Sequence, residues 1–203
     1  MTACRISSQD TNVNIKIPAS PRRKTLIVVD VQPQTLAPEA KVLIPFMASF
    51  ISKVDYSAYV EANYFADHNS MFFKQDGFLK TKEETGPSAQ EVRVAISSKS
   101  APHLLIEKNT RSCFKSSIGD EVRMFLERNE IEEVHFIGYD INDCVLASAY
   151  EAIDLGYFTY VIEELCHHWN ADESLKRAAI TIFRRQSMSN HGDHQLVQTI
   201  DVT

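Results

Sequence analysis

The sequence predicts an α/β fold in three layers, a mostly parallel sheet with helices on both faces. Two observations predict it. Short, β-rich apolar runs alternate along the chain with segments of helical apolar spacing, which is the pattern of successive βαβ units. The chain has 203 residues, enough for one domain with a full three-layer core.

We expect residues 24–203 to form this domain and residues 1–23 to form an N-terminal arm. The segment VNIKI at 13–17 alternates apolar and polar residues. Such alternation indicates either a short strand or an arm that lies on a neighbouring subunit. Pro18 and Pro21 end the segment.

The first half of the domain predicts two strands, a helix and a long loop. TLIVVDV at 25–31 is typical of a central parallel strand buried on both faces. A helix follows over 39–54, with Pro45 as a kink or restart. YSAYVEANYF at 56–65 is the second strand. The irregular residues 66–101 are expected to form a loop, either a lid over a site or a loop that packs its own small core.

The second half continues the alternation of strands and helices. Strands are predicted at 104–107, 134–137 and 157–162, and helices at 118–128, from about 142 to Gly156, and at 172–183. After residue 184 we expect a last short strand and a terminal helix.

Composition argues against several classes of partner. The formal net charge of −6, with no extended basic cluster, gives no support for nucleic-acid binding. No apolar run approaches the length of a membrane span, and the first residues lack the apolar segment of a signal peptide. The four cysteines show no CxxC spacing, and a chain of this size does not need disulfides. We therefore expect a cytoplasmic protein with reduced thiols and no membrane partner.

Three chemically active side chains follow strand ends: Asp30, Lys108 and Cys144. In a parallel sheet these positions share one edge. Cys144 also falls in the first turn of a helix, where free N–H groups and the helix dipole favour a thiolate. Asp30 can take the thiol proton, Lys108 can hold the Asp30 charge, and Cys144 can attack a carbonyl to form a thioester. A structural ion pair and a small core cysteine are the alternatives.

Three segments around these residues resemble a known family. They are TLIVVDVQ at 25–32, IEKNTRSCF at 106–114 and FIGYDINDCV at 136–145. Their order and spacing are similar to those of the isochorismatase-like cysteine hydrolase superfamily, which includes nicotinamidases and N-carbamoylsarcosine amidases. The resemblance extends over residues 24–190.

The resemblance implies a six-stranded, mostly parallel sheet and a catalytic triad of Asp30, Lys108 and Cys144. It also implies a cis peptide bond between Tyr139 and Asp140. The N–H groups of Asp140 and Cys144 would then form an oxyanion hole. Members of the family are commonly dimers or tetramers, so we expect a homo-dimer or homo-tetramer.

Two departures from the family pattern affect the expected chemistry. Nicotinamidases bind a metal through an Asp-x-His pair, whereas Asp67 and His68 are adjacent here and no second histidine follows nearby. We therefore expect neither a metal nor another cofactor. Asp140 stands where the family prefers a small residue, and its carboxylate would oppose a thiolate at Cys144 unless its side chain points away.

The resulting hypothesis is a metal-independent cysteine hydrolase that cleaves a C–N bond of a small amide or carbamoyl substrate. The expected substrate pocket consists of Gln32, Tyr64, Phe65, His68, Phe73 and Trp169. His167 and His168 could reach this pocket or a subunit contact. The alternatives are a catalytically degraded binding or regulatory protein, an isochorismatase-type hydrolase, and a thiol redox sensor that uses Cys144 and Cys113.

Overall fold

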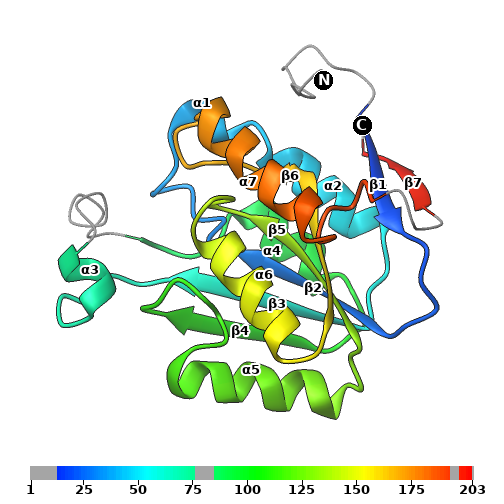
Figure 1. Ribbon diagram of the computed structural model, residues 1–203, viewed down its shortest axis with the longest axis horizontal. Helices are drawn as coiled ribbons and strands as arrows, with labels where there is room; N and C mark the ends of the chain where they lie inside the picture. The colour runs from blue at the N-terminus through cyan, green and yellow to red at the C-terminus, as the bar shows by residue number, and fades with distance from the viewer. Residues whose placement is uncertain (1–12, 76–84, 193–196, 203) are drawn as a thin grey trace.

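The computed structural model describes residues 13–75, 85–192 and 197–202. The first twelve residues of the expected arm and residues 76–84 of the expected long loop lie outside the described parts. The described residues form two sheets (Figure 1). The larger one has five parallel strands, in the order β4 (His103–Lys108), β3 (Ala58–Tyr64), β2 (Lys24–Val29), β5 (Glu133–Gly138), β6 (Phe158–Cys166).

Helices cover both faces of this sheet, which confirms the three-layer α/β fold (Figure 1). Along β2 the side chains of Leu26 and Val28 join one core cluster, and those of Ile27 and Val29 join the other. This alternation is what a strand buried on both faces requires. The helices are α1 (Pro38–Lys41), α2 (Ile44–Lys53), α3 (Met71–Gln75), α4 (Gln90–Ser97), α5 (Ser116–Arg128), α6 (Cys144–Asp154) and α7 (Glu173–Arg185).

The main sheet has five strands among the described residues, one fewer than the expected six. The segment after α7 lies where a sixth strand would pair. It runs parallel to β6 through a single bridge between Val161 and Ser189, with the N–H of Val161 donating to the carbonyl of Met188. One bridge is too short to make a strand, so the sheet ends at β6.

The two ends of the described chain form the second sheet. β1 (Asn14–Pro18) pairs antiparallel with β7 (Val197–Asp201), with Ile15 opposite Ile200. Ile15 and Ile17 are fully buried in the core cluster that contains α2 and α4. Because β1 pairs with a strand of its own chain, its alternating pattern reflects burial within the molecule. The expected terminal helix is not found among the described residues, where β7 is the last element.

Two further elements differ from the sequence prediction. The region 66–101 contains α3 and α4, and α4 buries Val92, Ala95 and Ile96 at the i, i+3, i+4 spacing of a helix face. The helix expected over 39–54 is divided into α1 and α2, with Pro45 in the first turn of α2, where proline is tolerated. No helix in the described parts is both long and apolar enough to cross a membrane.

Candidate active site

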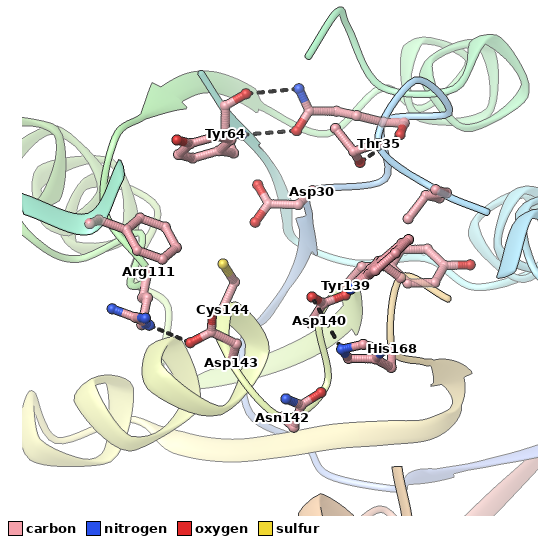
Figure 2. Close-up of a pocket in the computed structure, with 14 residues that line it drawn as sticks. Asp30, Thr35, Tyr64, Arg111, Tyr139, Asp140, Asn142, Asp143, Cys144 and His168 are labelled. Atoms are coloured by element: carbon pink, nitrogen blue, oxygen red, sulfur yellow. Dashed lines mark hydrogen bonds and ion pairs between the residues drawn. The ribbon is translucent and has the colours of Figure 1, made fainter. Parts of the chain in front are cut away.

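The loops at the carboxyl ends of the parallel strands bring Asp30, Lys108 and Cys144 together. Asp30 directly follows β2 with φ at 51°, and its N–H donates to the carbonyl of Ala62 on β3. Lys108 is the last residue of β4, and Cys144 is the first residue of α6. Figure 2 shows the Cys144 sulfur pointing toward the Asp30 carboxylate.

Lys108 holds the Asp30 carboxylate in a buried ion pair. The Lys108 Nζ lies 2.7 Å from Asp30 Oδ2 and also donates to the carbonyl of Thr110 at 3.2 Å. Lys108 is 1% exposed and Asp30 8% exposed. The other carboxylate oxygen, Oδ1, is buried and has no hydrogen-bond partner among the described residues. The pair therefore orients a carboxylate that keeps one oxygen available for a proton from Cys144.

Burial raises the pKa of the Cys144 thiol well above its ordinary value. The Lys108 ammonium acts to lower this pKa, whereas the carboxylates of Asp30 and Asp143 raise it further. For Lys108, burial acts to lower the pKa, but the charge of Asp30 raises it above its ordinary value. The resting site thus holds a neutral thiol and a charged lysine. The position of Cys144 in the first turn of α6 favours a thiolate on sequence grounds, whereas its burial raises the pKa of the thiol.

A tight turn between β5 and α6 positions the nucleophile. Gly138 ends β5 with φ at 122°, and a Cβ atom there would lie 2.0 Å from the carbonyl oxygen of Val29. The peptide bond between Tyr139 and Asp140 is cis. The N–H groups of Asp143 and Val145 both donate to the carbonyl of Asp140 at 3.0 Å. The backbone of Asp140 is thereby tied to the first turn of α6.

The side chain of Asp140 points toward His168, as Figure 2 shows, and its Oδ2 lies 4.0 Å from His168 Nε2. Asp143 is the carboxylate that, with Asp30, raises the pKa of Cys144. Asp143 in turn accepts a hydrogen bond from Arg111 Nε. The unusual carboxylate at position 140 therefore lies in the wall of the site, directed away from the sulfur.

A cavity of about 320 Å³ opens above these groups. Of the six residues expected on sequence grounds to line the substrate pocket, Gln32, Tyr64 and Trp169 line it. The full lining is Asp30, Gln32, Thr35, Leu36, Tyr64, Phe72, Arg111, Tyr139, Asp140, Asn142, Asp143, Cys144, His168 and Trp169.

Phe65, His68 and Phe73 do not line this cavity. Phe65 follows the end of β3 and is 38% exposed. His68 and Phe73 pack against each other, with ring centroids 4.4 Å apart. Phe72 takes the place of Phe73, because neighbouring residues of a helix point in different directions.

The amide of Gln32 is used to position the backbone around the cavity. Its Nε2 donates to the carbonyls of Tyr64 at 2.9 Å and Gly86 at 2.7 Å, and its Oε1 accepts from the N–H of Tyr64 at 3.0 Å. Gln32 therefore joins the loop after β2 to the end of β3 and to the segment that precedes α4.

Comparison with known protein families identifies the family to which this chain belongs. A family model described as the isochorismatase domain matches residues 24–191. The chain belongs to the isochorismatase family. This confirms the resemblance that the three motifs indicate, and it places the protein among the isochorismatase-like hydrolases.

Solved structures of isochorismatase-like hydrolases share the fold. N-carbamoylsarcosine amidase from Thermoplasma acidophilum is 23% identical over 82% of this chain and 94% of its own, with a TM-score of 0.63. The nicotinamidase from Staphylococcus aureus is 18% identical over 85% and 98%, with a TM-score of 0.63. An isochorismatase-like hydrolase from Alkaliphilus metalliredigens is 14% identical over 82% and 92%, with a TM-score of 0.65. A comparison with curated proteins found no match.

Asp67 and His68, the residues that stand nearest to the metal-binding pattern of nicotinamidases, make other contacts in this isochorismatase-family chain. The Asp67 carboxylate accepts the N–H of Asn69 and the side-chain amide of Asn109. His68 packs against Phe73. Within residues 13–75, 85–192 and 197–202 no group of three or more His, Cys, Asp or Glu side chains is placed to hold a metal ion.

Several lining residues were not anticipated from the sequence. Arg111 lies in the loop that follows Lys108, and Asn142 and Asp143 lie in the loop that precedes Cys144. Considering every residue of these two loops, and not only those at the strand ends, would have found them. Thr35 and Leu36 lie in the Pro-interrupted loop after β2, and nothing in their local sequence distinguishes them.

Proposed function

We propose that this protein is a metal-independent cysteine hydrolase that cleaves a C–N bond of a small amide or carbamoyl compound. The observation that carries the proposal is that Asp30 and Cys144 line one cavity while the buried Lys108 holds Asp30 from behind. Asp30 is held by Lys108 at 2.7 Å, and the Cys144 sulfur faces Asp30. A carboxylate with an oriented free oxygen beside a buried thiol is suited to general base catalysis of thiol attack.

In the acylation step, Cys144 Sγ forms a bond to the substrate carbonyl carbon as its proton passes to Asp30. The carbonyl oxygen becomes an oxyanion, which the N–H groups of Asp140 and Cys144 stabilise. Asp30 then gives the proton to the substrate nitrogen. The C–N bond breaks, ammonia or an amine leaves, and a thioester remains on Cys144.

In the deacylation step, water attacks the thioester carbonyl and Asp30 takes a proton from that water. The C–S bond breaks, the thiol of Cys144 regains the proton, and a carboxylic or carbamic acid leaves. Lys108 is charged in the resting site, since the Asp30 carboxylate raises its pKa. Its role is to orient the Asp30 carboxylate.

The raised pKa of Cys144 supports a base-dependent mechanism. A thiol that keeps its proton in the free protein needs a partner that removes the proton during attack. Asp30 is the carboxylate that both faces the sulfur and is held by a buried cation.

We predict that Asp30→Asn has opposite effects on two properties of Cys144: it slows hydrolysis and speeds alkylation of the thiol. Hydrolysis of an amide panel, measured by ammonia release, should fall by about 10²- to 10⁴-fold, the usual value of general acid–base catalysis. Alkylation of Cys144 by iodoacetamide near neutral pH should become faster, because Asp30 raises the pKa of that thiol and Lys108 lowers it. Peptide mass spectrometry across pH measures the alkylation.

Cys166 is the internal control for reagent access and folding. It is buried, its pKa is raised by burial to about 12, and it does not line the cavity, so its slow labelling should not change. Unchanged turnover in Asp30→Asn, or turnover retained by Cys144→Ala, would contradict the mechanism. Binding of amides without ammonia release from any of them would instead favour a binding or regulatory member of the family.

A further inference from the structure

Arg111 connects two parts of the cavity wall that belong to different elements (Figure 2). Its Nε donates a hydrogen bond to Asp143 Oδ1, immediately before α6. Its guanidinium carbon lies 4.2 Å from the centroid of the Phe72 ring on α3. All three side chains line the same cavity as Cys144. Arg111 therefore joins the start of the nucleophile helix to the part of the wall that α3 supplies.

The carboxylate of Asp143 does not have the usual role of an acidic residue at the start of a helix. Aspartate at this position normally accepts hydrogen bonds from the first N–H groups of the helix. Asp172 does so before α7, where it accepts from the N–H groups of Ser174 and Leu175. Asp143 holds the same position before α6, but within the described residues its side chain makes no capping bond to that helix. Its bond to Arg111 takes the place of helix capping.

A carboxylate at this position works against the chemistry of Cys144. Burial raises the pKa of the Cys144 thiol, and the charges of Asp30 and Asp143 raise it further. Asp30 is needed as the base, whereas Asp143 takes no part in the proposed proton transfers. The charge of Asp143 would also repel the oxyanion that the N–H of Cys144 stabilises. A cation bound to Asp143 offsets both effects.

The other charged or titratable groups around the sulfur contact different partners. Lys108 binds Asp30 at 2.7 Å, and Asp140 lies toward His168 at 4.0 Å. Arg111 contacts Asp143 directly, and the two side chains are 46% and 27% exposed. Because water reaches this pair, its effect on the sulfur should be moderate in size.

We propose that Arg111 is a positioning residue that keeps Cys144 reactive by binding and neutralising Asp143 at the start of α6. The inference rests on the proposed function and deepens it, because it concerns the nucleophile of that site. Arg111 acts through Asp143 and touches no reacting atom. A direct contact between Arg111 and the substrate would give different results in the experiment below.

Alkylation of Cys144 by iodoacetamide tests the electrostatic effect without hydrolysis. The rate at pH 8, measured by peptide mass spectrometry, follows the fraction of thiolate. Arg111→Met should lower this rate by about 3- to 10-fold, which corresponds to about half to one pH unit. Better access of the reagent would raise the rate, so a fall reports the charge. Arg111→Lys, which keeps the charge, should stay within about threefold of the unmodified protein.

The double variant Arg111→Met/Asp143→Asn is the decisive test. It should return to within about twofold of the unmodified protein, because the pair as a whole carries no net charge. Both variants lack the Arg111 side chain, so reagent access is matched and their difference reports the charge of Asp143. The value of kcat/KM for amide hydrolysis, measured by ammonia release, should fall about 10-fold in Arg111→Met through kcat and recover in the double variant.

Lys115→Met is the matched control. Lys115 forms a 2.7 Å ion pair with Glu151, which lies further along α6, and neither residue lines the cavity. Loss of this cation should leave the alkylation rate of Cys144 and the turnover within about twofold of the unmodified protein.

An unchanged or faster alkylation rate in Arg111→Met would overturn the inference. So would a defect that persists in the double variant, and persistence with a raised KM would mark Arg111 as a direct substrate contact. The alkylation rates are independent of turnover. The expected alkylation rates together with no ammonia release from any amide would reject the proposed hydrolase and leave the effect of Arg111 on the thiol standing.

Discussion

At the scale of single residues, burial distinguishes two lysine–aspartate pairs with nearly the same geometry. Lys108 and Asp30 are 2.7 Å apart and both are buried. Lys99 and Asp55 are 2.8 Å apart, but the Asp55 side chain is 93% exposed. Because water screens the second pair, only the first should contribute strongly to stability when one partner is removed.

We predict that Lys108→Met lowers the free energy of unfolding by about 3–5 kcal/mol, since it leaves the Asp30 charge buried without its cation. Lys99→Met should cost no more than about 1 kcal/mol. Urea denaturation measures both. The double variant Asp30→Asn/Lys108→Met should recover part of the loss, because no buried charge remains. Equal costs for the two lysine variants would show that the Asp30–Lys108 pair is not energetically special.

At the scale of elements, α6 lies between two glycines with different surroundings. Gly138 precedes it with φ at 122°, and a Cβ atom there would collide with the carbonyl of Val29. Gly156 follows it with φ at 94°, and a Cβ atom there would meet nothing within 4 Å. The first junction therefore needs glycine for both conformation and space, and the second for conformation alone.

We predict that Gly156→Ala costs about 1–2 kcal/mol of stability, from backbone conformation only. Gly138→Ala should lower stability by about 3 kcal/mol or more. The added Cβ atom must displace packed backbone, and this cost adds to the cost of the backbone conformation. Gly138→Ala should also abolish hydrolysis, since the turn it precedes positions Cys144. Urea denaturation and amide turnover are the measurements. A Gly138 variant as stable and active as the Gly156 variant would contradict this account of the turn.

At this scale, the sequence predicts some strands and helices correctly and misses others. TLIVVDV predicted a strand correctly because both faces of β2 are covered, so its apolar run is continuous. The helix α4 was not predicted, although Val92, Ala95 and Ile96 carry its buried face. These three apolar residues lie in a mostly polar segment, and only packing of α4 against α2 gives them a reason to be buried together.

At the scale of the whole molecule, the interior resists ionisation at alkaline pH. Burial raises the pKa values of Cys113 and Cys166 from 9.0 to about 12. The folded protein therefore keeps thiol protons that the unfolded chain releases above pH 9. Stability from this source is fully present below pH 9 and is lost as the pH rises toward 12. Burial of Tyr56 and Tyr139, which raises their pKa values, acts in the same direction above pH 10.

We predict that the free energy of unfolding falls between pH 8 and pH 10 by about 1.4 kcal/mol for each of Cys113 and Cys166. Urea denaturation under reducing conditions at the two pH values measures the difference. Cys166→Ala changes the absolute stability, but it should also make the pH-dependent loss smaller by about 1.4 kcal/mol. A stability that stays constant from pH 8 to pH 10 would be inconsistent with buried, protonated thiols.

The sequence by itself determined the α/β class, the family, and the positions of Asp30, Lys108 and Cys144 at strand ends. These features follow from local apolar runs and from the rule that parallel strands end at one edge. Only the tertiary structure decided that Phe72 rather than Phe73 faces the cavity, and that the Asp140 carboxylate turns toward His168. Side-chain direction and loss of water depend on segments that are distant in sequence, and they meet only when the chain is folded.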